Sequence, residues 1–287
     1  MTSSCCPPKE TESSASNNDS HRQAVREVYA GVANASNAGD SCGIESSCCG
    51  VSDDSAINTL ISTRMGYSES DLDAVPTGAD MGLGCGNPRA IASLKQGETV
   101  IDLGSGGGFD CFLAASEVSE QGKVIGIDMT PDMVSKARNN ADKGNYNNVE
   151  FRLGEIENLP VADNTADIII SNCVINLSPV KSRVFQEAFR ALKPGGRLAI
   201  SDVVATIEIP EEIRNDPALI AGCMGNAMLI EDLRDIIAEA GFEAIEIQPK
   251  DESHEFIRDW APGTNITDYV VSATIEGIKP SNPGSCC

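Results

Sequence analysis

The sequence predicts an α/β protein whose open, mostly parallel sheet has helices on both faces. Two observations carry this prediction. Between about residues 98 and 205, short apolar runs alternate with longer segments of helical spacing, which is typical of consecutive βαβ units. The apolar run at 166–171 contains three adjacent isoleucines, and this composition indicates a strand that is buried on both faces.

The individual elements follow from the same spacing. Five strands are expected in the regular region, at 98–103, 123–128, 148–153, 166–171 and 197–203. Helices are expected at 109–118, 131–141 and 180–196, the last of them closing in Lys, Pro and Gly. Beyond residue 205 the segment 211–228 predicts a helix, a break and a second helical segment interrupted at Gly222 and Gly225. A helix at 229–242 and strands at 242–248 and 268–278 are expected after it.

The first third of the chain is less regular. Residues 1–20 are rich in Ser, Asn, Pro and Glu, which is typical of disorder. Residues 21–32 have an apolar stripe at helical spacing, and the small, polar residues 33–55 indicate a long loop. A helix is expected to start near Ser68, because an acidic residue, Asp71, stands three positions later.

Charge and composition exclude several classes of partner. The chain has 43 acidic and 21 basic residues, a net charge of −22, which repels both nucleic-acid phosphates and anionic membrane surfaces. We therefore expect neither nucleic acid nor membrane as a partner. No apolar run reaches the roughly 18 residues of a membrane span, and the N-terminus lacks the apolar core of a secretory signal, so a cytoplasmic location is expected.

A glycine-rich turn follows the first strand in the sequence VIDLGSGGG. Asp102 stands two residues before its first glycine, and Asp128 stands at the end of the second strand. An acid at that second position can accept hydrogen bonds from both ribose hydroxyls of a nucleotide. The third glycine of a dinucleotide fingerprint is absent, because position 109 is Phe. The turn alone is also compatible with an ordinary tight turn.

The strand, the glycines and the two acids together resemble the class I S-adenosylmethionine-dependent methyltransferases, over roughly residues 75–205. The resemblance implies a Rossmann-like sheet whose last, antiparallel strand is 268–277. It also implies a set of cofactor-binding residues. These are Asp102, Gly104, Ser105 and Gly106 at the methionine and ribose part, Asp128 at the ribose hydroxyls, Met129, Glu155 and Ile156 near the adenine, and Asn172 near the sulfonium.

Three cysteines come from segments that the predicted fold brings to the carboxyl ends of the strands. Cys173 follows the fourth strand in SNCVINL, Cys85 lies in LGCGNP, and Cys223 lies in AGCMGNAM. Glycines beside Cys85 and Cys223 permit a close approach of the backbone, although a single buried cysteine is also a common core residue. Three thiols suit a soft centre. Zinc prefers paired Cys-x-x-Cys spacings, which the chain lacks.

Trivalent arsenic takes three thiolates and keeps a lone pair that can accept a methyl group without loss of a proton. Oxygen and nitrogen methylases often need a general base, and the two histidines lie outside every motif. The segments IDLGSGGGFDC, IGIDMT, SNCVINL, LKPGG, ISDV and PEEIR, together with GCGNP and the glycine-flanked Cys223, resemble the arsenite methyltransferases over about residues 65–275.

This second resemblance implies an enzyme that methylates thiolate-bound trivalent arsenic, with arsenite and methylarsenite as substrates. It implies that Cys85, Cys173 and Cys223 bind the arsenic and that an upstream cysteine joins a disulfide relay. Cys48 or Cys49 is predicted for the relay, with Cys42 as the alternative. Thioredoxin or glutathione is the expected reductant, no tightly bound metal cofactor is expected, and the protein is expected to be a monomer.

The remaining cysteines have weaker assignments. The vicinal pairs Cys5–Cys6, Cys48–Cys49 and Cys286–Cys287 could collect arsenic or could be inessential, and Cys111 is predicted to be a core residue. The predicted organisation is a flexible, Cys-rich extension at 1–65, a cofactor-binding domain at 66–205, an arsenic-site or cap region at 206–280 and a Cys-Cys tail at 281–287. Two other functions stay open at this point: a quinone-type C- or O-methyltransferase, and a non-enzymatic protein that binds soft metals.

Overall fold

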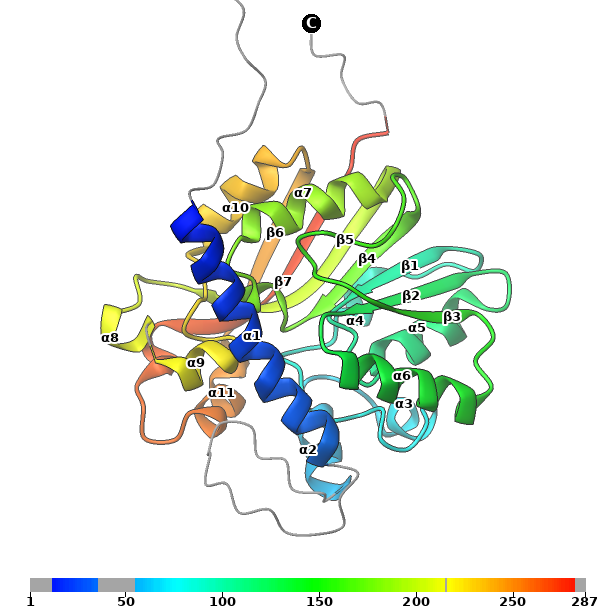
Figure 1. The fold of residues 1–287 in the computed structure, drawn as a ribbon, viewed down its shortest axis with the longest axis horizontal. Helices are drawn as coiled ribbons and strands as arrows, with labels where there is room; N and C mark the ends of the chain where they lie inside the picture. The colour runs from blue at the N-terminus through cyan, green and yellow to red at the C-terminus, as the bar shows by residue number, and fades with distance from the viewer. Residues whose placement is uncertain (1–11, 36–54, 215, 282–287) are drawn as a thin grey trace, which may run out of the picture.

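A seven-stranded sheet forms the centre of the part of the chain that the computed structural model describes, residues 12–35, 55–214 and 216–281 (Figure 1). The strand order is β3-β2-β1-β4-β5-β7-β6. The pairs from β3 to β5 are parallel, and β7 runs antiparallel to β5 and β6. The strands are β1 (Thr99–Leu103), β2 (Lys123–Asp128), β3 (Val149–Leu153), β4 (Ala166–Asn172), β5 (Leu192–Ala205), β6 (Glu243–Lys250) and β7 (Val270–Ile278).

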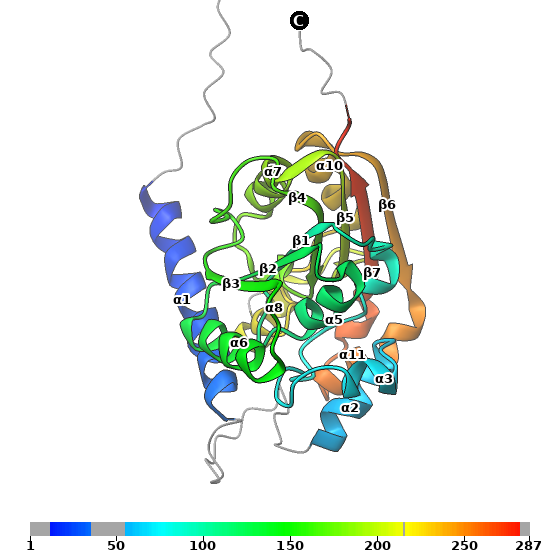
Figure 2. The same cartoon turned by 90° about the vertical axis from the view of Figure 1, so that its right-hand side faces the viewer.

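Helices cover both faces of the sheet, as the sequence predicts (Figures 1 and 2). One core lies under α4 (Arg89–Ala92), α5 (Phe109–Val118) and α6 (Pro131–Gly144), which pack on alternate residues of the central strands such as Val100 and Ile168. The other lies under α7 (Lys181–Ala191) and α10 (Ile230–Glu239), which pack on the intervening residues such as Ile101 and Ile169. The isoleucine run of β4 is therefore buried on both faces, as expected.

The strands agree closely with the sequence prediction, whereas one helix end does not. The predicted helix at 180–196 stops at Ala191, and β5 already begins at Leu192. Leu192 has φ −71° and ψ 142°, an extended conformation. Pro194 disfavours helical geometry at the residue before it and cannot donate a helical hydrogen bond, so the chain turns into the strand several residues early.

The N-terminal region contains more helix than the sequence predicts. Helix α1 spans Glu12–Ala35, so the expectation of disorder for residues 1–20 is wrong for residues 12–20. Val25 and Val32 are buried against the rest of the molecule, and a helix fixed by such packing extends at little cost into its polar flank. The predicted loop at 33–55 is helical at both ends, and residues 36–54 lie outside the described residues.

Other short elements surround the carboxyl ends of the strands. The helix expected near Ser68 is confirmed as α3 (Glu69–Asp73), with Ser68 and Asp71 forming a capping box. The helices not predicted are α2 (Ser55–Arg64), the short α4 and α11 (His254–Trp260), and three single turns, η1 (Ile175–Leu177), η2 (Asp251–Ser253) and η3 (Ile266–Asp268), complete the set. The predicted helix and the second helical segment are found as α8 (Glu211–Arg214) and α9 (Pro217–Ala221). The second segment ends at Gly222, and the chain after it forms a turn rather than a helix.

Strands β6 and β7 come from the predicted 206–280 region and extend the sheet of the 66–205 region, so the two regions share one sheet. The division at residue 205 stays a prediction about their roles. None of the helices in the described ranges is both long and apolar enough to cross a bilayer.

Candidate functional site

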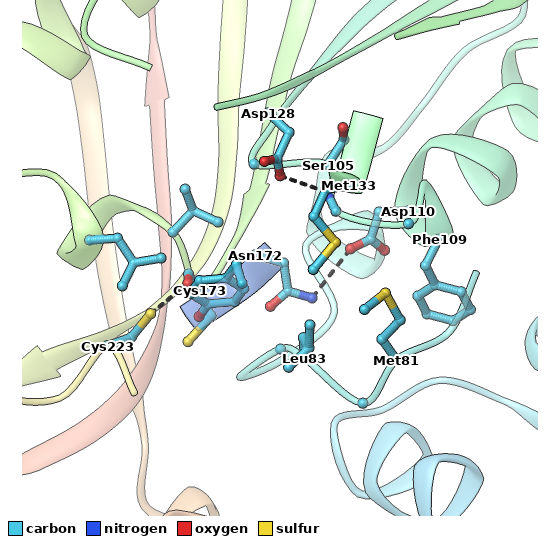
Figure 3. A pocket seen from close by; sticks show the side chains of 18 of the residues that line it. Met81, Leu83, Ser105, Phe109, Asp110, Asp128, Met133, Asn172, Cys173 and Cys223 are labelled. Atoms are coloured by element: carbon cyan, nitrogen blue, oxygen red, sulfur yellow. Dashed lines mark hydrogen bonds between the residues drawn. The ribbon is translucent and has the colours of Figure 1, made fainter. Parts of the chain in front are cut away.

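A cavity of about 450 Å³ lies at the carboxyl ends of β1, β2 and β4 (Figure 3). The glycine loop and the ends of these strands form one side of it. Residues of α1, α2 and α11 contribute to the lining, and so do two of the predicted cysteines, Cys173 and Cys223. This edge of an open α/β sheet is the usual place for ligands.

Asp128 fixes the glycine loop from the end of β2. Its carboxylate accepts hydrogen bonds from the backbone N–H of Gly106 at 3.0 Å and of Thr130 at 2.8 Å. Burial raises the pKa of Asp128, and these two N–H groups oppose that rise. The acid therefore occupies the predicted position beside the loop, where a ribose would lie between strand ends.

The residues of the loop fit a ligand that approaches the backbone closely. Gly106 has φ +49°, and a Cβ built there would meet nothing within 4 Å, so the backbone faces open space. Ser105 lines the cavity, and its buried Oγ has no hydrogen-bond partner within the described residues. Bare backbone and an unpaired hydroxyl beside Asp128 suit the polar ribose and methionine part of S-adenosylmethionine.

Of the other predicted cofactor residues, five line the cavity and one does not. Asp102, Gly104, Met129, Ile156 and Asn172 all line the cavity. Glu155 does not line it; its carboxylate forms ion pairs with Arg22, at 3.5 Å, and with Arg26 of α1.

Asp102 is buried beneath the loop. Burial and the neighbouring Asp110 raise its pKa well above the ordinary value, and the thiol of Cys111 donates a hydrogen bond to it at 3.2 Å. Cys111 itself is fully buried in the core, as predicted.

The three predicted thiols meet beside one end of the cavity: Cys173 and Cys223 line it, and Cys85 is buried behind them. The Sγ atoms of Cys85 and Cys173 and a carboxylate oxygen of Asp202 lie within 4.8 Å of one another. The thiol of Cys223 donates a hydrogen bond to the carbonyl oxygen of Cys173 at 2.7 Å. Cys85 and Cys223 are buried and Cys173 is half-buried. The fold therefore brings together three free thiols from distant parts of the sequence. Cys85 and Cys223 are 138 residues apart.

Two of these thiols, Cys85 and Cys173, are in an environment that favours the protonated form. Burial raises the pKa of the Cys85 thiol. Contact with the thiols of Cys223 and Cys85, together with burial, raises the pKa of Cys173 well above its ordinary value. Burial also raises the pKa of Asp202 to about 6, against the N–H groups of Val203 and Ile175. A ligand that removes the thiol protons on binding is therefore needed to form the thiolates.

The glycines beside Cys85 are required by its packing. A Cβ at Gly86 would lie 2.1 Å from Oγ of Ser201, and one at Gly84 would lie 2.8 Å from Nδ2 of Asn172. The Asn172 amide accepts from the backbone N–H of Cys85 at 3.0 Å and donates to the carbonyl oxygen of Gly86 at 2.8 Å. Asn172 thus lines the cavity and also positions the Cys85 turn.

Cys173 and Cys223 both adopt left-handed backbone conformations, with φ of 58° and 63°. Residues other than glycine rarely adopt such angles, and the surrounding structure must hold them there. The N–H of Cys173 donates to the carbonyl oxygen of Ser201 at 2.8 Å, and the N–H of Cys223 donates to that of Ile220 at 3.0 Å. Both cysteines are therefore placed by constrained turns.

The sequence argument missed several residues of the site. Tyr67 donates to Asp110 at 2.6 Å and accepts from Asn172 at 3.0 Å, and both Tyr67 and Asp110 line the cavity. Helix α1 contributes Val25 and Tyr29 to the lining. The apolar stripe of 21–32 predicted a buried face for this helix, but nothing in it indicated what that face covers.

Some predicted residues cannot be placed. Cys42, Cys48 and Cys49 lie outside the described residues, and so do Cys5, Cys6, Cys286 and Cys287.

Comparison with known proteins agrees with this geometry. Residues 94–241 match the family model described as a methyltransferase domain. An arsenite methyltransferase from Halobacterium salinarum is 53% identical over 91% of this chain and 67% of its own length. Another from Aquipseudomonas alcaligenes is 42% identical over 58% of this chain and 50% of its own length. The crystal structure of an arsenic(III) S-adenosylmethionine methyltransferase from Chlamydomonas reinhardtii has a TM-score of 0.57 and 32% identity, covering 78% of this chain and 74% of that one.

The sheet order and the glycine loop with Asp128 define a class I S-adenosylmethionine-dependent methyltransferase. Within that class, the extent of the similarity to the Halobacterium protein and to the Chlamydomonas structure places the chain in one group. The chain belongs to the arsenite methyltransferase family. It spans about half the length of the Aquipseudomonas relative.

Replacing Asp128 with alanine should weaken binding of S-adenosylmethionine by roughly 1.5–3 kcal/mol, the scale of hydrogen bonds to a charged group. The variant also loses the hydrogen bond that holds the N–H of Gly106, and this loss should weaken cofactor binding further. Asp128→Asn keeps the shape and one acceptor oxygen, so it should lose less. Calorimetry on both folded variants measures the effect, and arsenite binding should barely change. Wild-type cofactor affinity in Asp128→Ala would remove this residue from the cofactor site.

Proposed function

We propose that the chain transfers methyl groups from S-adenosylmethionine to trivalent arsenic held by the thiolates of Cys85, Cys173 and Cys223, giving methylated arsenicals. The observation that supports this most strongly is the meeting of the three thiols at the end of the cavity that also contains the glycine loop. Soft ligands of this kind favour a thiophilic centre. Membership of the arsenite methyltransferase family supports the same substrate.

Binding of arsenite to these thiols needs no separate base. Arsenous acid is neutral at pH 7, so the acidic surface does not repel it. Each thiol replaces one hydroxyl group, and its proton leaves with that hydroxyl as water. The raised pKa values of Cys85 and Cys173 therefore do not prevent the formation of As–S bonds.

When bound, S-adenosylmethionine supplies a methyl group on a positively charged sulfur, which an arsenic lone pair can accept without loss of a proton. The chain's own residues position the two reactants and exclude water from the arsenic. Asp128 and the glycine loop are proposed to hold the ribose and methionine part, and the buried Cys85 and Cys223 exclude water from the arsenic. Orientation and desolvation of this kind are established sources of rate enhancement.

Each transfer formally oxidises arsenic to the pentavalent state, so two electrons must be returned before the next one. We propose that protein thiols return them by forming a disulfide, which thioredoxin or glutathione then reduces. Cys48 or Cys49 is the proposed upstream partner, with Cys42 as the alternative. Their segment joins α1 to α2, and both helices contribute residues to the cavity lining, which supports this role.

The other expectations for the protein stand as part of the proposal. It acts in the cytoplasm as a monomer, without a resident metal cofactor, and its small-molecule substrates are arsenite and methylarsenite. The final methylation state of the product is left open by the sequence and by the site.

The direct test is an assay with arsenite, a thiol reductant and methyl-labelled S-adenosylmethionine. We expect the label to appear in arsenicals separated by chromatography. A protein that binds arsenite tightly but transfers no label would be a soft-metal binding protein instead. Label transferred to a quinone acceptor and not to arsenic would favour the quinone-type methyltransferase.

The valence of arsenic makes the three cysteines unequal. Methylarsenite has one bond to carbon and can take only two thiolates. Cys173 and Cys223 line the cavity and contact each other, whereas Cys85 is buried outside the lining. Cys173→Ser and Cys223→Ser should therefore abolish methylation of both arsenite and methylarsenite, while Cys85→Ser should lose arsenite methylation and retain activity on methylarsenite.

Rates measured on the two substrates separately test this ordering. Serine is close to cysteine in size, so a loss would reflect the softness of the ligand rather than a packing defect. The idea of a two-thiolate site fails if folded Cys173→Ser methylates methylarsenite at the wild-type rate.

The relay role of the upstream pair predicts a different pattern. Replacing Cys48 and Cys49 together with serine should slow turnover of arsenite, because reduction of the product is impaired. Binding of S-adenosylmethionine measured by calorimetry should stay unchanged. Full multiple-turnover activity of the double variant, with thioredoxin as the reductant, would show that these cysteines are bystanders.

A further inference from the structure

Two buried polar side chains connect the turns that carry Cys173 and Cys223. Asp202 and Asn176 are 2% and 3% exposed, and they belong to the segments ISDV and SNCVINL. Within the described residues, neither side chain has a hydrogen bond to the glycine loop. Burial of a carboxylate and an amide in a core costs free energy unless their hydrogen bonds are made. Their hydrogen-bond partners therefore show which parts of the chain these two side chains hold in place.

Asp202 holds the turn that follows Cys173. Its carboxylate accepts from the backbone N–H of Ile175 at 2.8 Å and from that of Val203 at 2.7 Å. The first of these bonds fixes the chain two residues beyond Cys173, whose left-handed φ of 58° needs such support. The second bond fixes the carboxylate to its own strand, β5.

Asn176 extends this connection to the Cys223 turn. Its side-chain amide donates to the carboxylate of Asp202 at 2.9 Å and to the carbonyl oxygen of Cys223 at 3.1 Å. It also donates to the carbonyl oxygen of Val203 at 2.6 Å. A continuous path of hydrogen bonds therefore runs from the Cys173 turn through Asp202 and Asn176 to Cys223.

We propose that Asp202 and Asn176 are positioning residues for the thiol site, and that their hydrogen bonds set the separation of the Cys173 and Cys223 thiols so that one arsenic atom can bind both. This inference rests on the proposed three-thiolate site. Their proposed role is to hold the turns that carry the cysteines rather than to bond arsenic. They act as the supporting groups around metal sites do, by fixing the orientation of the ligands.

The test uses Asn176→Ala in the full chain, with arsenite as the probe. Arsenite affinity should fall by about 10- to 100-fold, the usual effect of removing such a supporting group. X-ray absorption at the arsenic edge should show the number of As–S bonds falling from three to two, because Cys223 is no longer held in place. Affinity for S-adenosylmethionine should stay within about twofold of wild type, since the glycine loop is untouched.

Asn148→Ala is the matched control. That side chain also donates to two backbone carbonyl oxygens, those of Ala115 at 3.1 Å and Ser119 at 2.9 Å, but it lies before β3 and away from the thiols. It should lower stability without changing the arsenic coordination. If Asn176→Ala does not fold, Asn176→Ser, which keeps one donor, takes its place with a smaller loss of affinity.

The outcomes separate the two proposals. Wild-type protein that fails to bind arsenite through three sulfur atoms would contradict the proposed thiol site itself. Wild-type protein with three As–S bonds, together with folded Asn176 variants that keep all three bonds and the same affinity, would overturn only the positioning role. A fall in coordination number that Asn148→Ala shares would also overturn it, since the effect would then be one of general stability.

Discussion

The register of β4, β5 and β7 determines where two of the three thiols, Cys85 and Cys173, lie. Asn172 at the end of β4 pairs with Ser201 of β5, and Ser201 pairs with Thr274 of β7. The carbonyl oxygen of Ser201 accepts from the N–H of Cys173, and the hydroxyl of Ser272 in β7 donates to the carbonyl oxygen of Cys85 at 2.6 Å. A shift of one residue between these strands would turn each of these groups to the opposite face and separate the thiols.

The thiol site has glycine-rich segments in its sequence but a rigid arrangement in the structure. The glycines beside Cys85 do not loosen that turn; they allow it to pack against Ser201 and Asn172 at distances that a Cβ would forbid. Cys173 and Cys223 are in strained conformations that hydrogen bonds from the sheet and from Asn176 hold in place. Rigid placement matters for the proposed arsenic site, in which three thiolates reach one small atom, because thiols free to move would lose conformational entropy on binding.

Much of the fold and the choice of thiols could be predicted because their signals are local. The strands and helices between residues 98 and 205 are encoded by their own spacing, and Cys85 and Cys223 stand beside glycines in the sequence. The roles of Asp202 and Asn176 could not be predicted, since they depend on partners 26 to 47 positions away. Helix α7 ends earlier than predicted, because the conformational effect of Pro194 extends to the residues before it.

Helix α1 shows how the two halves of the site are linked. Toward the cofactor side, Arg22 donates to Glu157 at 3.2 Å and also pairs with Glu155. Toward the thiol side, Tyr29 donates to the carbonyl oxygen of Ala221, two residues before Cys223, and Val25 packs against Cys223 itself. One helix therefore lines the cavity both beside Glu157 and beside Cys223. The methyl donor and its acceptor must meet with water excluded, and a shared wall meets that requirement without a separate element for each ligand.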